Sequence, residues 1–349
     1  MQIAFYISGH GFGHTSRSIE LIKALVTARP ATRVIVKTAA PSWLFDAIVG
    51  PSVTIAPFEA DTGVAQLDSL NIDERESVRR AIAFYGSFDA LADREAAFLR
   101  DSGATVVLGD IPPLAHAAAG RAGLPSVAVG NFTWDWIYAG YDSFRRDART
   151  VIDVIGEAYA LATRALRLPI HGGFEPMAAV TVDIPFIARA STRDRADTRH
   201  QLGVPGDRPF VLASFGAYGL TAAYEDIARA QQLTVLSPRA DLPSGLAYQD
   251  VVAAADLVIS KPGYGIVSEC VANGTPLLFT SRGHFVEYDV FVAEMPRVLR
   301  CRFIPQYDLL AGRWRAHIDA LLTQPPAPER PRIDGAHAAV TEIMNLVNG

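Results

Sequence analysis

Cysteine is scarce in this sequence: only Cys270 and Cys301 occur among 349 residues. Two cysteines cannot build a disulfide framework, and this usage is typical of a reducing, cytoplasmic compartment. Long apolar runs are missing as well, since no uninterrupted stretch approaches the ~18 residues that a membrane span requires. No cationic segment precedes the short apolar run at the N-terminus, so we expect no signal peptide.

An excess of positive charge is also missing. The formal net charge is −5, so the sequence lacks the basic footprint of a nucleic-acid-binding domain. The spacings H-E-x-x-H, C-x-x-C and the Walker A phosphate loop do not occur. The sequence therefore predicts no nucleic-acid partner, no metal site and no bound cofactor. Peripheral contact with a membrane stays open if a substrate is a lipid.

Apolar strand patterns alternate with amphipathic helix patterns along the whole chain, which predicts an α/β fold with parallel sheets. The length favours about two domains. The segment 170–207 is rich in Gly, Pro and charge, and we place the boundary within it. The predicted domains are residues 1–180 and 181–349. The last predicted helix, Ala336–Val347, is free to pack back on the first domain.

A glycine-rich loop, Gly9–His14, directly follows the predicted strand Ile3–Ile7. Gly11 and Gly13 allow a tight turn and close approach of the backbone to a ligand. A dinucleotide site is one alternative, but it needs an acidic residue at the end of the second strand, and Lys37 and Thr38 stand there. The other alternative is a turn that only connects strand and helix.

Two histidines share this loop. A neutral imidazole at the start of a helix can act as a general base toward a hydroxyl group, and we predict this role for His14. His10 is the competing candidate and is assigned to acceptor binding. A structural role for either residue is the alternative.

A second glycine-rich loop, Lys261–Glu269, follows the predicted strand Leu257–Ile259. Its helix start would point backbone amides at a phosphate, and Lys261 would offset phosphate charge. Glu269 is predicted to accept the hydroxyls of a ribose, with stabilisation of the helix dipole as the alternative. Glu287 is assigned to the donor sugar. The other predicted donor-binding residues are Gly11, Gly13, Gly216, Gly263, Tyr264, Gly265 and Ser268.

Aromatic and polar residues alternate after the predicted strand Ser126–Val129. Such a mixture suits a sugar, because ring faces stack and polar tips bind hydroxyls. We predict that an acceptor is bound by this segment, with local core packing as the alternative. Further polar candidates at strand ends are Asp61, Gln66, Asp68 and Asp110. The predicted acceptor-binding residues are His10, Asn131, Trp134, Asp135 and Tyr138.

Together these motifs resemble the GT-B glycosyltransferases. The loop that ends in His14 looks like that of the transferase adding N-acetylglucosamine to the lipid precursor of peptidoglycan. The Lys261–Glu269 block is similar to the donor motif of UDP-glycosyltransferases, with Lys261 at the position of a His and no Gln after Glu287. A closer resemblance covers most of the chain and is to the glycosyltransferase-like N-terminal domain of L-arabinokinase and its stand-alone bacterial relatives. It rests on GHGFGH, NFTWDWIY and K-x-GYG-x-VSE.

The resemblance implies a GT-B fold, that is, two Rossmann-like lobes with parallel sheets facing a central cleft. The first lobe would bind an acceptor and the second a nucleotide-sugar, with a UDP-sugar favoured over a GDP- or dTDP-sugar. It implies a metal-independent, inverting transfer with His14 as base. The alternatives are a non-catalytic nucleotide-sugar-binding protein and a sugar-nucleotide epimerase. No kinase motif accompanies these features, so a sugar-kinase activity is not implied.

Overall fold

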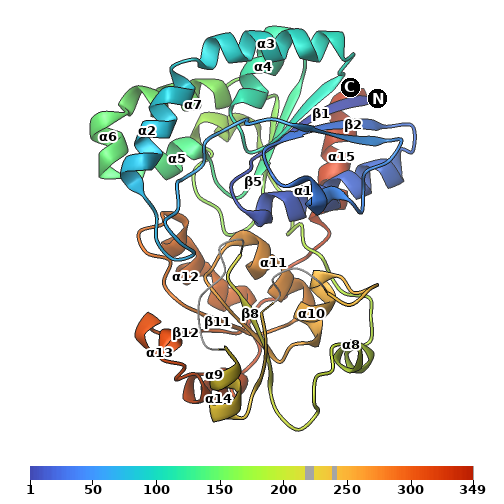
Figure 1. Cartoon of the computed structure of the whole chain (residues 1–349). Helices are drawn as coiled ribbons and strands as arrows, with labels where there is room; N and C mark the ends of the chain where they lie inside the picture. Colours follow the sequence, from blue (N-terminus) through green and yellow to red (C-terminus); the bar gives the residue numbers. More distant parts are fainter. Residues whose placement is uncertain (217–223, 238–241, 349) are drawn as a thin grey trace. The chain divides into compact units, whose positions relative to one another are not determined.

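The computed structural model describes residues 1–216, 224–237 and 242–348. These residues form two compact units (Figure 1). Unit 1 consists of Met1–Ala65, Ile72–Ile187 and Arg332–Gly349. Unit 2 consists of Gln66–Asn71 and Ala188–Pro331. Both units are α/β with a parallel sheet, as the sequence predicts.

The unit boundaries differ from the single division between 180 and 181. Strand β7 (Thr181–Asp183) pairs with β6 (Arg164–Arg167), so unit 1 extends to Ile187. The last helix, α15 (Gly335–Asn348), packs against α1 (Phe12–Ala28) and returns the chain to unit 1. The segment Gln66–Asn71 belongs to unit 2, which the pattern of strands and helices does not indicate.

The sheet of unit 1 has seven strands within the described ranges, in the order β3-β2-β1-β4-β5-β6-β7. The order reverses between β1 and β4, and Ile7 at the end of β1 is in register with Asp110 at the end of β4. Right-handed crossovers on the two sides of such a point place helices on opposite faces and leave a binding site at the strand ends. The remaining strands are β1 (Gln2–Ile7), β2 (Arg33–Thr38), β3 (Val53–Pro57), β4 (Val106–Asp110) and β5 (Ser126–Gly130).

Helices cover both faces of this sheet. In Figure 1, α3 and α4 lie on one side of β1 and β2, and α1 and α15 lie on the other. Two consecutive helices, α2 and α3, meet at Gly86 and Ser87. These and the other helices are η1 (Ser42–Phe45), α2 (Glu74–Tyr85), α3 (Phe88–Asp101), α4 (Leu114–Ala122), α5 (Trp134–Ala139), α6 (Asp142–Asp147), α7 (Arg149–Tyr159) and η2 (Glu175–Val180).

The sheet of unit 2 has five strands among the described residues, in the order β12-β11-β10-β8-β9. Its order reverses between β8 and β10, where Ser214 and Ser260 are in register. The strands are β8 (Phe210–Ser214), β9 (Thr234–Leu236), β10 (Leu257–Ser260), β11 (Leu277–Phe279) and β12 (Cys301–Phe303). The helices are α8 (Arg195–Gln201), α9 (Tyr224–Gln231), α10 (Tyr248–Ala254), α11 (Tyr264–Asn273), α12 (Glu287–Val298), α13 (Gln306–Leu310) and α14 (Arg315–Leu322).

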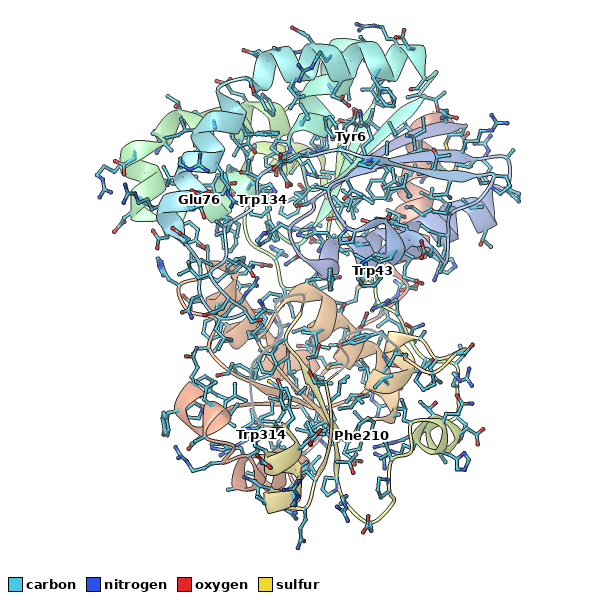
Figure 2. The ribbon with its side chains drawn as sticks, in the orientation of Figure 1. Tyr6, Trp43, Glu76, Trp134, Phe210 and Trp314 are labelled. Carbon is cyan, nitrogen blue, oxygen red and sulfur yellow. The ribbon has the colours of Figure 1, made fainter. Side chains whose placement is uncertain are left out.

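The central strands, such as β4 and β10, are buried along their whole length, which explains why they are apolar runs. Trp134 is fully buried in unit 1 and Trp314 in unit 2, where both are labelled in Figure 2. The two reversal points therefore sit on rigid cores. Each is followed by one of the glycine-rich loops, after β1 in unit 1 and after β10 in unit 2.

Candidate functional site

The first candidate site lies at the reversal point of unit 1. Helix α1 starts at Phe12, so His14 stands in its first turn and Arg17 and Ser18 follow on the same face, three and four residues on. The register of β1 with β4 brings Asp110 to this face. All four side chains are buried.

Asp110 is the centre of the resulting network. Its Oδ1 lies 2.8 Å from His14 Nδ1, and its Oδ2 accepts hydrogen bonds from Arg17 Nε at 2.8 Å and Ser18 Oγ at 2.7 Å. Burial alone raises the pKa of Asp110, but the charge of Arg17 and the hydrogen bonds from Arg17 and His14 outweigh it and lower this pKa to about 2. Asp110 is therefore a carboxylate that can only accept hydrogen bonds.

The contacts of His14 Nδ1 bear on which nitrogen of this ring carries the proton. Nδ1 lies 2.8 Å from Asp110 Oδ1 and 2.9 Å from Arg17 Nη2. Arg17 already donates two hydrogen bonds to the same carboxylate. We therefore infer from the network that His14 donates its Nδ1–H to Asp110. Nε2 then carries the lone pair, which is the atom a general base uses.

A second buried carboxyl group, that of Asp61, lies next to the start of the Gly9–His14 loop. It accepts hydrogen bonds from Ser8 Oγ at 3.0 Å and from the indole Nε1 of Trp134 at 2.9 Å. Burial raises the pKa of Asp61 to about 6, although both hydrogen bonds lower it. The sequence places Asp61 only among polar strand-end candidates, and its fully buried position is decided by packing.

His10 packs against the same support. Its ring is edge-on to Trp134 at a centroid distance of 5.5 Å, and its Nδ1 accepts a hydrogen bond from the Val64 N–H at 3.4 Å. A Cβ at Gly63 would lie 2.6 Å from His10 Nδ1, and Gly63 also has a φ of +58°. Only glycine fits this position, so the segment around Gly63 is shaped around the His10 ring.

The predicted acceptor-binding aromatic residues are buried. Tyr138 donates its hydroxyl to the Gly63 carbonyl at 2.8 Å and stacks on Phe144 at 4.1 Å. Trp134 and Tyr138 are 0% exposed, so neither presents a ring face to a ligand in this structure. Trp134 donates a hydrogen bond to Asp61, and Tyr138 donates one to the Gly63 carbonyl. These contacts match the alternative interpretation of this segment, local core packing.

Asn131 and Asp135 have different surroundings. Asn131 is buried and accepts a hydrogen bond from Arg17 Nη1 at 2.7 Å, which joins it to the His14 network. Asp135 is half-buried, and burial raises its pKa. Within the described part of the chain, its Oδ1 makes no hydrogen bond. This oxygen is also buried, so it is not open to a ligand in this structure.

An aromatic pair that the sequence analysis does not single out stands beside the glycine-rich loop. Phe12 and Trp43 are edge-to-face with ring centroids 5.8 Å apart, and Trp43 is 60% exposed (Figure 2). Gly11 has a φ of +83°, and a Cβ there would meet nothing within 4 Å. The surface over Gly11 is therefore open and has exposed aromatic area next to it. The only sequence signal is Phe12 inside the loop itself.

The second candidate site lies at the reversal point of unit 2. Lys261 follows β10, and Gly263 is the N-cap of the ten-residue helix α11 without a side-chain cap. Burial and the nearby Arg282 lower the pKa of Lys261 to about 7, whereas Asp68 opposes this change. A Cβ on Gly263 would lie 3.9 Å from Arg282 Nη1. Two cationic side chains therefore accompany the backbone amides of a helix start, which suits an anion.

Gly216 and Glu287 come after β8 and β11, the two strands that flank β10. Glu287 is buried at the start of α12 with its Oε2 3.8 Å from Arg282 Nη1, so it faces the same cation. Gly216 follows β8 with a φ of +68°. The rest of its motif, residues 217–219, lies outside the described residues. Gly13 is in the first turn of α1.

Glu269 is already paired. It is 3% exposed, and its Oε1 accepts hydrogen bonds from Arg189 Nε at 2.6 Å and from Arg189 Nη2. The role of Glu269 in ribose binding stays a prediction, and a ribose would have to share this carboxylate with Arg189. Ser268 donates to the Gly265 carbonyl at 3.0 Å and Tyr264 is buried, so both stabilise the helix start.

Arg189 and Arg17 are the principal residues that the sequence analysis missed. Arg189 is an isolated arginine in the segment between the units, and no motif marks it. Arg17 carries a weak signal, its position one helical turn after His14. Both act by pairing with a carboxylate far away in the sequence, Arg17 with Asp110 and Arg189 with Glu269.

Comparison with solved structures decides the fold. The glycotransferase of kitacinnamycin superposes with a TM-score of 0.64 at 16% identity, covering 99% of both chains. The calicheamicin glycosyltransferase gives 0.61 at 16% identity over 99% of this chain and 98% of that one. MurG from Acinetobacter baumannii gives 0.55 at 13% identity over 99% of each chain. This is the GT-B fold.

Sequence relatives agree with the GT-B assignment. The chain is 30% identical to L-arabinokinase of Arabidopsis thaliana over 344 residues, which cover 93% of this chain and 32% of that protein. It is 26% identical over 222 residues to the N-acetylglucosamine transferase of Clavibacter michiganensis that acts on pyrophosphoryl-undecaprenol-linked N-acetylmuramyl-(pentapeptide), covering 57% of each. The chain thus spans about a third of the length of L-arabinokinase and somewhat over half of the length of the N-acetylglucosamine transferase. No protein-family model matches it.

Two kinds of feature are absent from the described residues of this chain. Among them, no group of three or more His, Cys, Asp or Glu side chains is arranged to hold a metal ion. In the same residues, no helix has the length and apolar character to cross a membrane.

Proposed function

We propose that this chain is an inverting, metal-independent glycosyltransferase that moves a sugar from a UDP-sugar to an acceptor hydroxyl. The observation that carries the proposal is the 2.8 Å contact between His14 Nδ1 and the Asp110 carboxylate. It leaves His14 Nε2 as a base on a helix start beside an open loop. The GT-B fold and the anion-binding features of unit 2 support the same activity.

In the proposed reaction, His14 Nε2 takes the proton of the acceptor hydroxyl as its oxygen bonds to the anomeric carbon. The bond from that carbon to the diphosphate breaks, and its electron pair goes to the diphosphate oxygen. The α11 amides, Lys261 and Arg282 stabilise this developing charge without a metal ion. Attack from the side opposite the leaving group inverts the anomeric centre.

The residues proposed to contact the acceptor are chosen by the solvent exposure of their side chains. Because Trp134 and Tyr138 are buried, the apolar face of an acceptor is assigned to Phe12 and the exposed Trp43. Asp135 stays a predicted acceptor residue, but its unpartnered Oδ1 is buried in this structure and would have to become exposed before an acceptor hydroxyl could reach it. Asn131 and His10 then act through Arg17 and the Gly63 segment, by positioning the base and its loop.

A ligand panel tests the donor site first. We expect UDP to raise the melting temperature in EDTA as much as in Mg²⁺, since ~100 times the Kd contributes roughly 2.7 kcal/mol. The melting temperature should rise less with GDP, dTDP, CDP, ADP or NAD. Lys261→Met should abolish the UDP effect, whereas Lys23→Met, at an exposed lysine of unit 1, should keep it. A response to NAD alone, or to none of the panel, would contradict the proposal.

Turnover tests the base. With a UDP-sugar that binds and an acceptor panel of small alcohols, phenols and glycans, His14→Ala should lower the rate by about 10²–10⁴-fold. UDP affinity should be kept in this variant, and His200→Ala, on α8 of unit 2, should match the wild type. Binding without transfer to any acceptor would favour a non-catalytic binding protein. Release of an epimerised sugar nucleotide without acceptor would favour an epimerase.

A further inference from the structure

The segment Gln66–Asn71, here called the strap, belongs to unit 2 although the chain on both sides of it belongs to unit 1. It leaves unit 1 after Ala65 and returns at Ile72. Only a few residues separate it from Asp61 and Gly63, which support the loop of His10 and His14. The strap is thus a piece of the first half of the sequence built into the proposed donor unit.

Two buried residues anchor the strap. Leu70 is 6% exposed and belongs to the apolar core of unit 2 together with Phe215 and Leu278. Ser69 is 3% exposed and donates a hydrogen bond to the Phe215 carbonyl at 2.9 Å. Burial of the Leu70 side chain removes apolar surface from water and so favours this position of the strap.

A close backbone approach fixes where the strap runs. A Cβ at Gly283 would lie 2.8 Å from the Leu70 carbonyl oxygen, so only glycine accommodates the strap there. Phe215 follows β8, Gly283 follows β11, and Lys261 follows β10 between them. The strap therefore lies at the same strand-end edge as the anion-binding features of unit 2.

Asp68 gives the strap a negative charge at this edge. It accepts hydrogen bonds from the N–H groups of Leu70 at 2.7 Å and Asn71 at 2.9 Å, and from the Asn71 side chain. These hydrogen bonds, that of the Asn71 side chain foremost, lower the pKa of Asp68. Among the described residues, the charges of Arg282 and Asp68 act on the Lys261 amine in opposite directions, and Glu287 faces Arg282.

We propose that Asp68 on the strap competes with phosphate oxygens for Lys261 and thereby weakens binding of the nucleoside diphosphate product more than binding of the nucleotide-sugar donor. This proposal rests on the proposed function. A terminal phosphate has a further ionisable oxygen with a pKa near 6, so the released diphosphate is more negative than the sugar-linked one. A fixed carboxylate repels the more negative ligand more strongly.

Calorimetry with UDP and UDP-glucose tests the proposal. Asp68→Asn keeps an oxygen for the two backbone N–H groups and removes the charge. We expect it to tighten UDP binding about threefold to tenfold, on the scale of one screened charge pair, and UDP-glucose binding by less. Asp207→Asn, which precedes β8 at the other end of the strand, should change neither. Unchanged or weaker UDP binding in Asp68→Asn would overturn the proposal.

A second measurement separates failure of this proposal from failure of the proposed function. If no uridine nucleotide binds the wild type, the donor site is wrong. The pH dependence of Lys261 acetylation by acetic anhydride, read by peptide mass spectrometry, then still reports on Asp68. In Asp68→Asn, the loss of a neighbouring negative charge should move the pH midpoint of Lys261 acetylation to lower pH. The pH midpoint of Lys23 acetylation should stay the same. An unmoved Lys261 midpoint shows that Asp68 does not act on this amine and overturns the proposal.

Discussion

Arg17 Nη2 lies 2.9 Å from His14 Nδ1 and also donates a hydrogen bond to Asp110 Oδ1 at 2.5 Å. One guanidinium thus neutralises the buried carboxylate that orients the histidine. Arg17, Asp110 and His14 are joined by these contacts, so the stability of unit 1 and the proposed role of His14 as a base depend on the same contacts.

Replacing Arg17 by Met should destabilise the protein strongly. The Asp110 carboxylate would stay buried without its guanidinium, and breaking a buried ion pair costs about 3–5 kcal/mol. The free energy of unfolding from urea titrations measures this loss. Arg79→Met is the control, because the Arg79–Glu76 pair is exposed and such pairs contribute only ~0–1 kcal/mol. A loss below about 1 kcal/mol in Arg17→Met would mean that Asp110 is not held as a carboxylate by Arg17.

The assigned tautomer of His14 can be observed directly. Nitrogen-15 NMR of the histidine side chains at neutral pH should show His14 with a protonated Nδ1 and an unprotonated Nε2. Asp110→Asn should shift His14 toward the Nε2–H form, because the Asn amide can donate to Nδ1. In the same Asp110→Asn variant, turnover should fall by about 10²–10⁴-fold. Asp101→Asn, at the exposed end of α3, serves as control. A protonated Nε2 in the wild type would remove His14 as the base.

Asp61 predicts a pH dependence of stability. Its pKa is raised from 3.8 to about 6 in the folded protein. Its contribution to stability is therefore fully present below about pH 4 and is lost as the pH rises through about 6. Asp61→Asn does not titrate, so its stability relative to the wild type should increase between these pH values, by on the order of 3 kcal/mol.

Urea titrations of both proteins at several pH values measure this difference. Ser8→Ala removes a hydrogen bond that lowers the Asp61 pKa, so the transition of that variant should lie at higher pH. A difference between Asp61→Asn and the wild type that does not change with pH would show that Asp61 titrates as it does in the unfolded chain.

The pair of Glu269 with Arg189 separates a ribose-binding role from a structural one. If Glu269 accepts ribose hydroxyls, Glu269→Gln should weaken UDP binding by about 10–100-fold, the scale of a hydrogen bond to a charged group. Pyrophosphate binding should change much less, because pyrophosphate has no ribose. Glu294→Gln, at an exposed residue of α12, should leave both unchanged. Equal weakening of both ligands would mean that Glu269 acts only by holding Arg189 and α11.

The strands and the two glycine-rich loops were predictable because their signals are local. An apolar run buried on both faces, a glycine turn and an amphipathic helix lie consecutively in the chain, and hydrophobic burial enforces the same order in space. For this reason the parallel sheets, the loop before α1 and the loop before α11 are found where the sequence predicts them. His14 and Lys261 follow, since their places in these loops are properties of the chain itself.

Only the tertiary structure decided what these residues contact. Asp110 meets Arg17 across 93 residues and Glu269 meets Arg189 across 80, and no local pattern encodes such pairs. The burial of Trp134 and the placement of the strap in unit 2 are likewise outcomes of packing. The indole of a tryptophan can pack against a sugar ring or in an apolar core, and the residue type alone does not distinguish the two. Which of these it forms depends on the surfaces that the rest of the chain brings to it.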